Sequence, residues 1–98
     1  MSAVTLDIEV PGDLEYLQGH FPEQPVLPGV VQVHWAIERA TDHFGALGAF
    51  RGIEALKFHR IIEPDTDLRL ELEFSDGKLR FSYSSEYGKH SQGRILFE

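Results

Sequence analysis

Apolar and polar residues alternate along most of this chain, and one segment follows a helical period instead. Residues 4–10 alternate and then meet Pro11-Gly12, which predicts a strand with one buried face that ends at this dipeptide. Residues 29–44 carry apolar side chains at helical spacing, which predicts a helix that Gly45 can end. The chain thus begins with a strand and reaches this helix after a long intervening segment.

The expected helix has one wide apolar face. One arc holds Val30, Val33, His34, Ile37, Ala40, Thr41 and Phe44, and the opposite side holds Gln32, Arg39 and His43. Three valines and a tryptophan in the first two turns are mediocre helix formers, so tertiary burial must hold this helix in place. We therefore expect other elements to cover it on most sides.

The alternation returns after the helix. It predicts strands within residues 51–62, 68–74, 79–83 and 94–97. Residues 75–78, Ser-Asp-Gly-Lys, predict a hairpin with a type I′ turn, because Asp-Gly suits the positive φ angles of that turn. A further turn is expected near residues 87–89. A strand, a loop, a helix and four strands predict a single α+β domain, residues 1–98, whose antiparallel sheet curls around the helix.

Charge and composition narrow the range of partners. The net charge of −7 and the scattered basic residues argue against nucleic acid, which needs a basic surface. Cysteine is absent from the sequence, so disulfides and cysteine-based metal sites are excluded. No apolar run approaches the ~20 residues of a membrane span, and the acidic N-terminal segment does not look like a signal peptide, so we expect a cytoplasmic protein. A chain of 98 residues buries little surface, which favours an oligomer.

A stiff loop precedes the helix and carries a histidine. Residues 13–28 show no period, and their three prolines exclude a long regular element. We expect this loop to direct His20 towards the helix start, where unpaired amides of Gly29 and Val30 and the helix dipole can polarise a carbonyl oxygen. Histidine has a reference pKa of about 6.5, so it is a suitable base for removing a proton next to that carbonyl.

The same chemistry needs an acid, and His34 lies one turn into the helix. Its position on the apolar arc would shield it from bulk water and let it face a substrate. His34 is equally a candidate core histidine that donates to a backbone carbonyl, so both interpretations stay open. The histidines lack the short spacings of zinc sites, so we expect no metal and no other cofactor. Solvated roles are expected for His43, His59 and His90.

The run His20-Phe21-Pro22-x-x-Pro25-x-x-Pro28-Gly29-Val30 resembles the active-site motif of the β-hydroxyacyl-acyl-carrier-protein dehydratases. Residues 56–70, LKFHRIIEPDTDLRL, are similar to a second block of that family, a strand, a Pro-Asp turn and another strand. The resemblance implies a dimeric hot-dog fold, in which two subunits share a continuous sheet and each active site lies across their interface. It also implies that His20 is the base and that the Gly29 amide binds the thioester carbonyl.

The position fourteen residues after His20 departs from the family pattern. The family has Glu or Asp there, whereas this chain has His34. A protonated His34 can deliver a proton to the leaving hydroxyl with help from a carboxylate, and Glu38 lies one turn further on. The alternative is an acid from a second, related hot-dog subunit in a heterodimer. Residues 32–36, QVHWA, also resemble the small dehydratase-like proteins of aryl polyene lipid pathways.

The leading hypothesis is a lyase that removes water from 3-hydroxyacyl thioesters, linked to acyl carrier protein or coenzyme A, in fatty acid or polyene-type lipid synthesis. Its expected catalytic residues are His20, Gly29 and His34, and its expected substrate contacts are Phe21, Pro28, Val30 and Trp35. Lys57, Arg60, Lys89 and Arg94 are candidates for docking an acidic carrier, although an ordinary solvated charge is the better interpretation of each. Two alternatives stay open, a thioesterase that uses Glu38 and a non-catalytic subunit that completes a partner's site. We expect a homodimer or a heterodimer with another hot-dog subunit.

Overall fold

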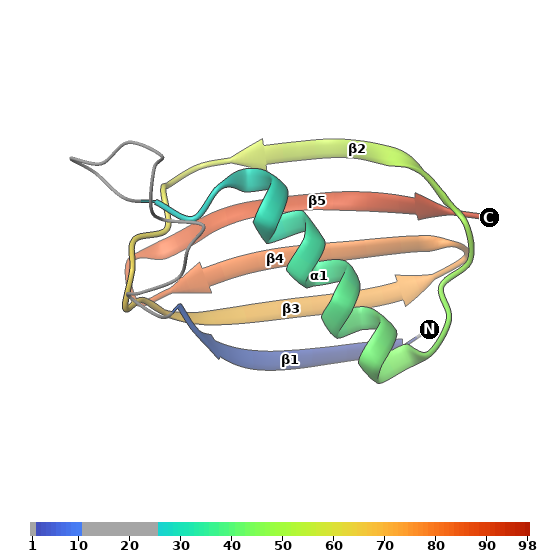
Figure 1. The fold of residues 1–98 in the computed structure, drawn as a ribbon, viewed down its shortest axis with the longest axis horizontal. Helices are drawn as coiled ribbons and strands as arrows, with labels where there is room; N and C mark the ends of the chain where they lie inside the picture. The colour runs from blue at the N-terminus through green and yellow to red at the C-terminus, as the bar shows by residue number, and fades with distance from the viewer. Residues whose placement is uncertain (1, 11–25) are drawn as a thin grey trace.

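The structure, a computed structural model, describes residues 2–10 and 26–98. In these residues one helix lies across a face of a five-stranded antiparallel sheet (Figure 1). The elements are β1 (Ser2–Glu9), α1 (Gly29–Phe44), β2 (Phe50–Phe58), β3 (Asp67–Ser75), β4 (Lys78–Ser85) and β5 (Gly88–Phe97). The order of strands is β1-β3-β4-β5-β2, which leaves β1 and β2 at the edges. This arrangement confirms the α+β hot-dog fold expected from the sequence.

The alternation of the central strands explains the core between the sheet and the helix. Leu70 of β3 pairs with Leu6 of β1 on one side and with Tyr83 of β4 on the other. Leu70 and Tyr83 have no exposed surface. The residues that alternate with the buried ones along each strand point to the other face of the sheet. The buried side chains of the core come from all three of these strands, from β5 and from α1.

The hairpin between β3 and β4 has the conformation that its sequence predicts. Asp76 and Gly77 have φ angles of 54° and 73°, the left-handed values that a type I′ turn requires. The next turn, between β4 and β5, comes slightly earlier than expected, at Glu86 and Tyr87.

Most strand boundaries lie within two residues of the expected ones, and two differ by more. The strand expected over 51–62 ends at Phe58, because the amides of His59 and Arg60 both donate to the carbonyl of His90, at 2.8 and 3.1 Å. The strand expected over 94–97 begins at Gly88. Its first half is polar, so the apolar alternation that marks a strand was hidden there.

The rotation of α1 differs from the expected one. Its buried residues are Val31, Gln32, Val33, Ala36 and Ala40, whereas Val30 is 77% exposed and both His34 and Thr41 face solvent. The valines at both ends of the first turn made two rotations almost equally apolar. The expectation that Val30 and His34 are buried and that Gln32 is solvated was therefore wrong. The expectation that other elements of this chain cover α1 on most sides was also wrong.

His90 also differs from its expected place. His43 and His59 are exposed as expected, but His90 is only 2% exposed. Its ring lies between two partners, the carbonyl oxygen of Ile61, 2.9 Å from Nδ1, and Oγ of Ser85, 2.6 Å from Nε2. Buried polar groups need such partners, and no sequence pattern links residues 61, 85 and 90.

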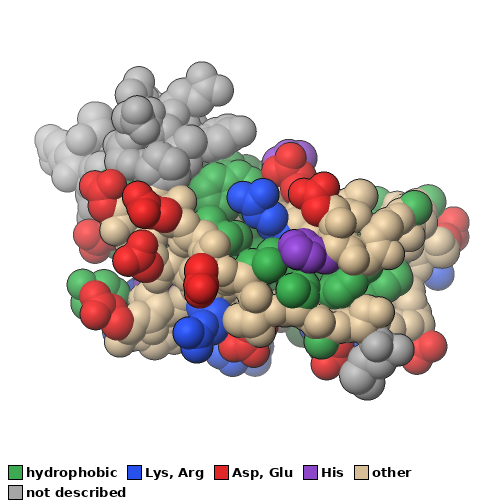
Figure 2. Space-filling model, turned by 90° about the horizontal axis from the view of Figure 1, so that it is seen from below, with side chains coloured by type: hydrophobic (Ala, Val, Ile, Leu, Met, Phe, Trp, Pro, Cys, Tyr) green, Lys and Arg blue, Asp and Glu red, His purple; other side chains and the backbone are tan. Residues whose placement is uncertain are grey.

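The charge of the described surface is uneven. Acidic side chains gather towards the end of the sheet at which β1 ends and β3 begins (Figure 2). The residues there include Asp7, Glu9, Glu63, Asp65, Asp67 and Glu86. Within the described ranges, no helix has the length and apolar character that crossing a membrane requires.

Candidate functional site

The start of α1 presents backbone amides that nothing in the described residues satisfies. Pro28 precedes the helix in an extended conformation, with φ −61° and ψ 148°, and no side chain of the described residues caps the first turn. The amides of Val31 and Gln32 donate to the Pro28 carbonyl at 3.1 and 3.2 Å. Within residues 2–10 and 26–98, the amides of Gly29 and Val30 have no acceptor. Two N–H groups and the positive end of the helix dipole are therefore directed away from the helix.

Glycine at position 29 lets another group come close to this helix end. A Cβ atom added to Gly29 would lie 2.5 Å from Cζ of Phe58, well inside normal contact distance. Phe58 is the last residue of the edge strand β2, and 54% of it is exposed. Gly29 therefore keeps its amide next to an aromatic ring at an open edge of the sheet.

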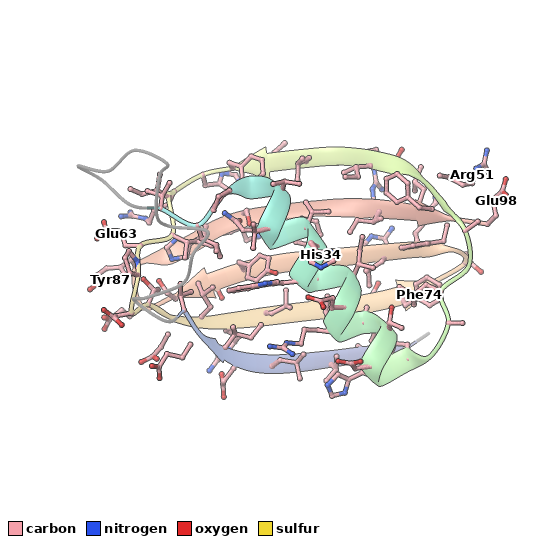
Figure 3. All side chains as sticks on the ribbon, in the orientation of Figure 1. His34, Arg51, Glu63, Phe74, Tyr87 and Glu98 are labelled. Carbon is pink, nitrogen blue, oxygen red and sulfur yellow. The ribbon has the colours of Figure 1, made fainter. Side chains whose placement is uncertain are left out.

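One exposed stripe of α1 runs from this helix start. Val30, His34 and Glu38 follow one another at intervals of one turn, and all three are exposed. His34 Nε2 lies 3.5 Å from Glu38 Oε1, with 63% and 55% of the two side chains exposed. Figure 3 shows the place of His34 on α1. The interpretation of His34 as a core histidine is therefore wrong. Its side chain is available to a substrate or to a second subunit, and Glu38 is the carboxylate that contacts it.

The remaining expected site residues divide into two groups. Pro28 and Trp35 are half-buried, and Trp35 packs against the core. His20 and Phe21 lie in residues 11–25, outside the described residues, so their predicted roles stay predictions. The described part of the site is thus the first turns of α1, which bring together Gly29, Val30 and His34.

A buried hydrogen-bond network lies beneath the helix start, and the sequence did not predict it. Gln32, 3% exposed, donates from Nε2 to the Leu27 carbonyl at 3.0 Å and accepts at Oε1 from Ser91 Oγ at 2.6 Å. Tyr83 donates its hydroxyl to the Gln32 carbonyl at 2.6 Å, and burial raises the pKa of Tyr83 well above its usual value. No sequence signal marks these contacts, because Ser91 and Tyr83 come from strands far along the chain.

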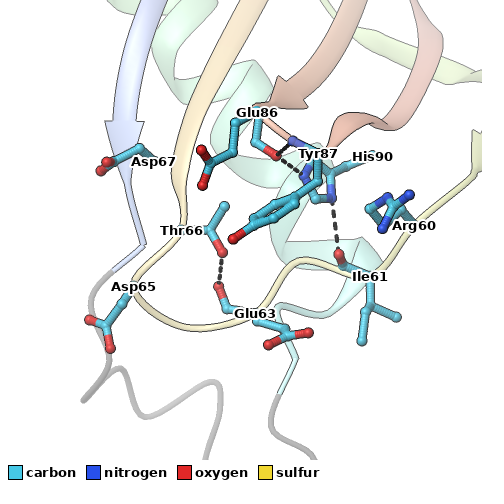
Figure 4. A pocket seen from close by; sticks show the side chains of 10 residues that line it. Arg60, Ile61, Glu63, Asp65, Thr66, Asp67, Glu86, Tyr87 and His90 are labelled. Atoms are coloured by element: carbon cyan, nitrogen blue, oxygen red, sulfur yellow. Dashed lines mark hydrogen bonds between the residues drawn. The ribbon is translucent and has the colours of Figure 1, made fainter.

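A separate cleft lies at the end of the sheet, and its lining includes none of the expected catalytic or substrate-contact residues. Its lining includes Arg60, Ile61, Glu63, Ser85, Tyr87 and His90 (Figure 4). Four carboxylates, those of Glu63, Asp65, Asp67 and Glu86, make this cleft unfavourable for a phosphate-bearing carrier or coenzyme. Among the residues that the structure describes, no three His, Asp or Glu side chains are grouped as metal ligands would be.

The family comparisons agree with the motif at this helix. Residues 1–94 match the family model of the ApeI-like proteins, described as ApeI dehydratase. The 3-hydroxyacyl-[acyl-carrier-protein] dehydratase FabZ of Acetivibrio thermocellus is 42% identical over 71 residues, which cover 65% of this chain and 49% of that enzyme. The chain thus spans about half the length of these curated relatives, 49% of this FabZ enzyme and 50% of a second one, from Ruminiclostridium cellulolyticum.

Two solved structures are similar over almost the whole chain. The dehydratase heterocomplex ApeI:P from Xenorhabdus doucetiae has a TM-score of 0.89 at 30% identity, covering 96% of this chain and 85% of that one. An uncharacterised protein from Erwinia carotovora subsp. atroseptica has a TM-score of 0.87 at 38% identity, with 96% and 81% covered. With the family match over residues 1–94, these similarities show that the chain belongs to the ApeI-like dehydratase family.

Proposed function

We propose that this chain is a cytoplasmic dehydratase that removes water from 3-hydroxyacyl thioesters linked to an acyl carrier protein. The observation that carries the proposal is the uncapped start of α1, where the Gly29 and Val30 amides lack an acceptor in the described residues and His34 is exposed one turn away. This helix start lies within the motif that the chain shares with dehydratases.

In the proposed reaction His20 removes a proton from the carbon between the thioester carbonyl and the hydroxyl-bearing carbon. The electron pair of that C–H bond moves onto the carbonyl oxygen, and the Gly29 amide donates to this enolate oxygen. When the enolate collapses, a C=C bond forms and the C–O bond to the hydroxyl breaks. The departing hydroxyl takes a proton from an acid and leaves as water, and the products are an enoyl thioester and water.

This chain differs from the family pattern in the residue that would protonate the leaving hydroxyl. His34 is our first candidate, because its exposed ring lies on the same stripe of α1 as Val30 and contacts Glu38 at 3.5 Å. That contact orients the ring and gives the imidazolium form a neighbouring carboxylate. The second candidate is an acidic residue of a partner subunit that reaches the same stripe.

A second hot-dog subunit fits the β2 edge. Six large apolar residues between 38% and 77% exposed lie on β2, directly after it or on the nearby helix start: Val30, Phe50, Ile53, Leu56, Phe58 and Ile61. The described residues of the other edge strand, β1, include no such exposed large hydrophobic residue. Pairing through β2 would satisfy its free backbone groups and cover this apolar surface. We propose a homodimer, or a heterodimer of the kind that the name of the ApeI:P complex describes.

The test is dehydration of a 3-hydroxyacyl carrier protein by the purified chain, alone and mixed with a related hot-dog subunit, followed as enoyl product by mass spectrometry. The expected result is enoyl product with the wild type and a rate at least ~100-fold lower with His20→Ala. Equal rates for the two proteins would overturn the assignment. Release of a free thiol without enoyl product would indicate a thioesterase, and activity that depends wholly on the partner's histidine would indicate a non-catalytic subunit.

A further inference from the structure

Gln32 is a polar residue at a fully enclosed position. It is 3% exposed, between Val31 and Val33, in the first turn of the helix whose start forms the proposed site. Its side chain uses both ends, since Nε2 donates to Leu27 and Oε1 accepts from Ser91. An apolar side chain of similar size would fill this space without the cost of desolvating an amide. The hydrogen bonds at both ends of the amide offset this cost, and they fix the orientation of the groups that they join.

Those bonds connect both sides of the helix start to the sheet. The Leu27 carbonyl lies just before Pro28, and the Leu27 amide donates to the Ile62 carbonyl at 2.8 Å. On the helix side, the carbonyl of Gln32 accepts from Tyr83 of β4, and its Oε1 accepts from Ser91 of β5 at 2.6 Å. The peptide that enters the helix and the first helical turn are therefore fixed to two central strands through one residue.

We propose that Gln32 is a positioning residue that, with Ser91, fixes the direction of the Gly29 amide towards the thioester oxygen. The inference rests on the proposed dehydratase function. The Gly29 peptide lies between Leu27 and Gln32 in the sequence, and no side chain of the described residues caps it. Its amide direction is consequently set by what holds these two neighbours. Gln32 does not touch the substrate in this proposal and acts only through the backbone.

The expected loss of rate follows from how strongly catalysis depends on the position of the Gly29 amide. A displacement of about 1 Å at a group that stabilises a transition state can cost ~100-fold in rate. Without the Gln32 amide, the Leu27 carbonyl loses a 3.0 Å bond and Ser91 Oγ loses its acceptor at 2.6 Å. The helix start then keeps its apolar packing through Val31 and Val33 but loses its directed attachments. We expect kcat to fall while binding of the acyl chain is retained.

The experiment compares Gln32→Met and Ser91→Ala with a matched control, Thr41→Val. Thr41 lies in the last turn of the same helix and donates its hydroxyl to the Ile37 carbonyl at 2.8 Å, so the control removes one helix-directed hydroxyl far from the site. We expect kcat to fall about 10- to 100-fold for Gln32→Met, with KM changed less than about three-fold. Ser91→Ala should lower kcat about three- to ten-fold, and Thr41→Val should leave kcat and KM unchanged.

Hydrogen exchange separates a loss of positioning from a general loss of stability. In Gln32→Met the amides of Val31 and Gln32, which donate to the Pro28 carbonyl, should exchange faster, while the Gly45 amide, bonded to the Thr41 carbonyl at 3.0 Å, should not change. If the wild type is active and Gln32→Met keeps its kcat per folded molecule, the positioning role is overturned and the proposed function stands. Faster exchange along the whole helix with a matching loss of folded protein also overturns it. An inactive wild type overturns the proposed function together with the inference.

Discussion

Phe50 offers a direct test of the proposed β2 interface without touching the site. It is the first residue of β2, at the opposite end of the strand from Phe58, and it is 58% exposed. A phenylalanine side chain carries on the order of 200 Å² of surface, so about 100 Å² remains for a partner to cover. Our perturbation is Phe50→Ser, which removes this apolar surface and keeps a residue that a strand tolerates.

The expected loss can be estimated from that area. At about 25 cal/mol per Å², covering 100 Å² contributes roughly 2.5 kcal/mol per subunit, and a two-fold symmetric dimer counts the residue twice. Incomplete burial lowers this sum, so we expect the free energy of association to weaken by about 3 kcal/mol. The dissociation constant then rises ~100-fold. Phe50 also meets Phe97 edge-on, with ring centroids 6.3 Å apart, so the substitution also destabilises the subunit itself, by about 1 kcal/mol.

Sedimentation velocity over a concentration series measures the dissociation constant, and urea unfolding measures subunit stability separately. The matched control is Tyr87→Ser, because Tyr87 is 61% exposed but lies in the turn between β4 and β5 rather than on β2. Phe50→Ser should weaken self-association, or association with a related subunit, while Tyr87→Ser should not. Equal dissociation constants for the two variants would refute the assignment of β2 as the interface.

Three further predictions follow from single residues. Gly29→Ala should lower kcat at least ~10-fold in the dehydration assay, since the new Cβ would lie 2.5 Å from Phe58 Cζ, so that the Phe58 ring or the helix start must shift; an unchanged kcat would contradict this role. Leu70→Ala should lower the free energy of unfolding by about 2 to 5 kcal/mol in urea melts, because Leu70 is 0% exposed, and a loss under ~1 kcal/mol would place the core elsewhere. Burial raises the pKa of Tyr83 in the folded state, so the unfolded chain loses that proton first; stability should fall as pH rises above ~10, by up to about 1.4 kcal/mol per unit, and Tyr83→Phe should remove this part of the slope in melts from pH 8 to 12.

The sequence predicted the elements well and their rotation poorly. Alternation predicted the strands, Asp76-Gly77 predicted the hairpin turn, and the helical period predicted α1 with the bounds that the structure has. The predicted rotation of α1 about its axis was wrong, because apolar residues at 30, 31 and 33 permit two buried faces. The burial of Gln32 depends on its hydrogen bond from Ser91, which is 59 residues away in the sequence, and no local pattern predicts that contact.

The candidate site shows the same division between local and distant information. A local motif predicts Gly29 and His34 as site residues, since helix starts and their amides are local features. The exposure of His34 depends on which face of α1 meets the sheet, and the burial of His90 depends on a carbonyl at Ile61 and a hydroxyl at Ser85. These are properties of the folded sheet, so no local pattern predicts that polar residues of β5 such as His90 and Ser91 are buried.

The proposed site and the proposed interface meet at one place, the Phe58 end of β2. Phe58 lies against Gly29 and is half-exposed, and Val30, which follows Gly29, is the most exposed large hydrophobic residue in the described part of the chain. A partner that covers these two residues would also exclude water from the neighbouring amides. Electrostatic stabilisation of an enolate oxygen by amides is stronger in a dry, low-dielectric site than in contact with bulk water. Association through β2 would therefore stabilise the subunit and make its helix start effective for catalysis in the same step, which gives the proposed assembly of this 98-residue chain a physical reason.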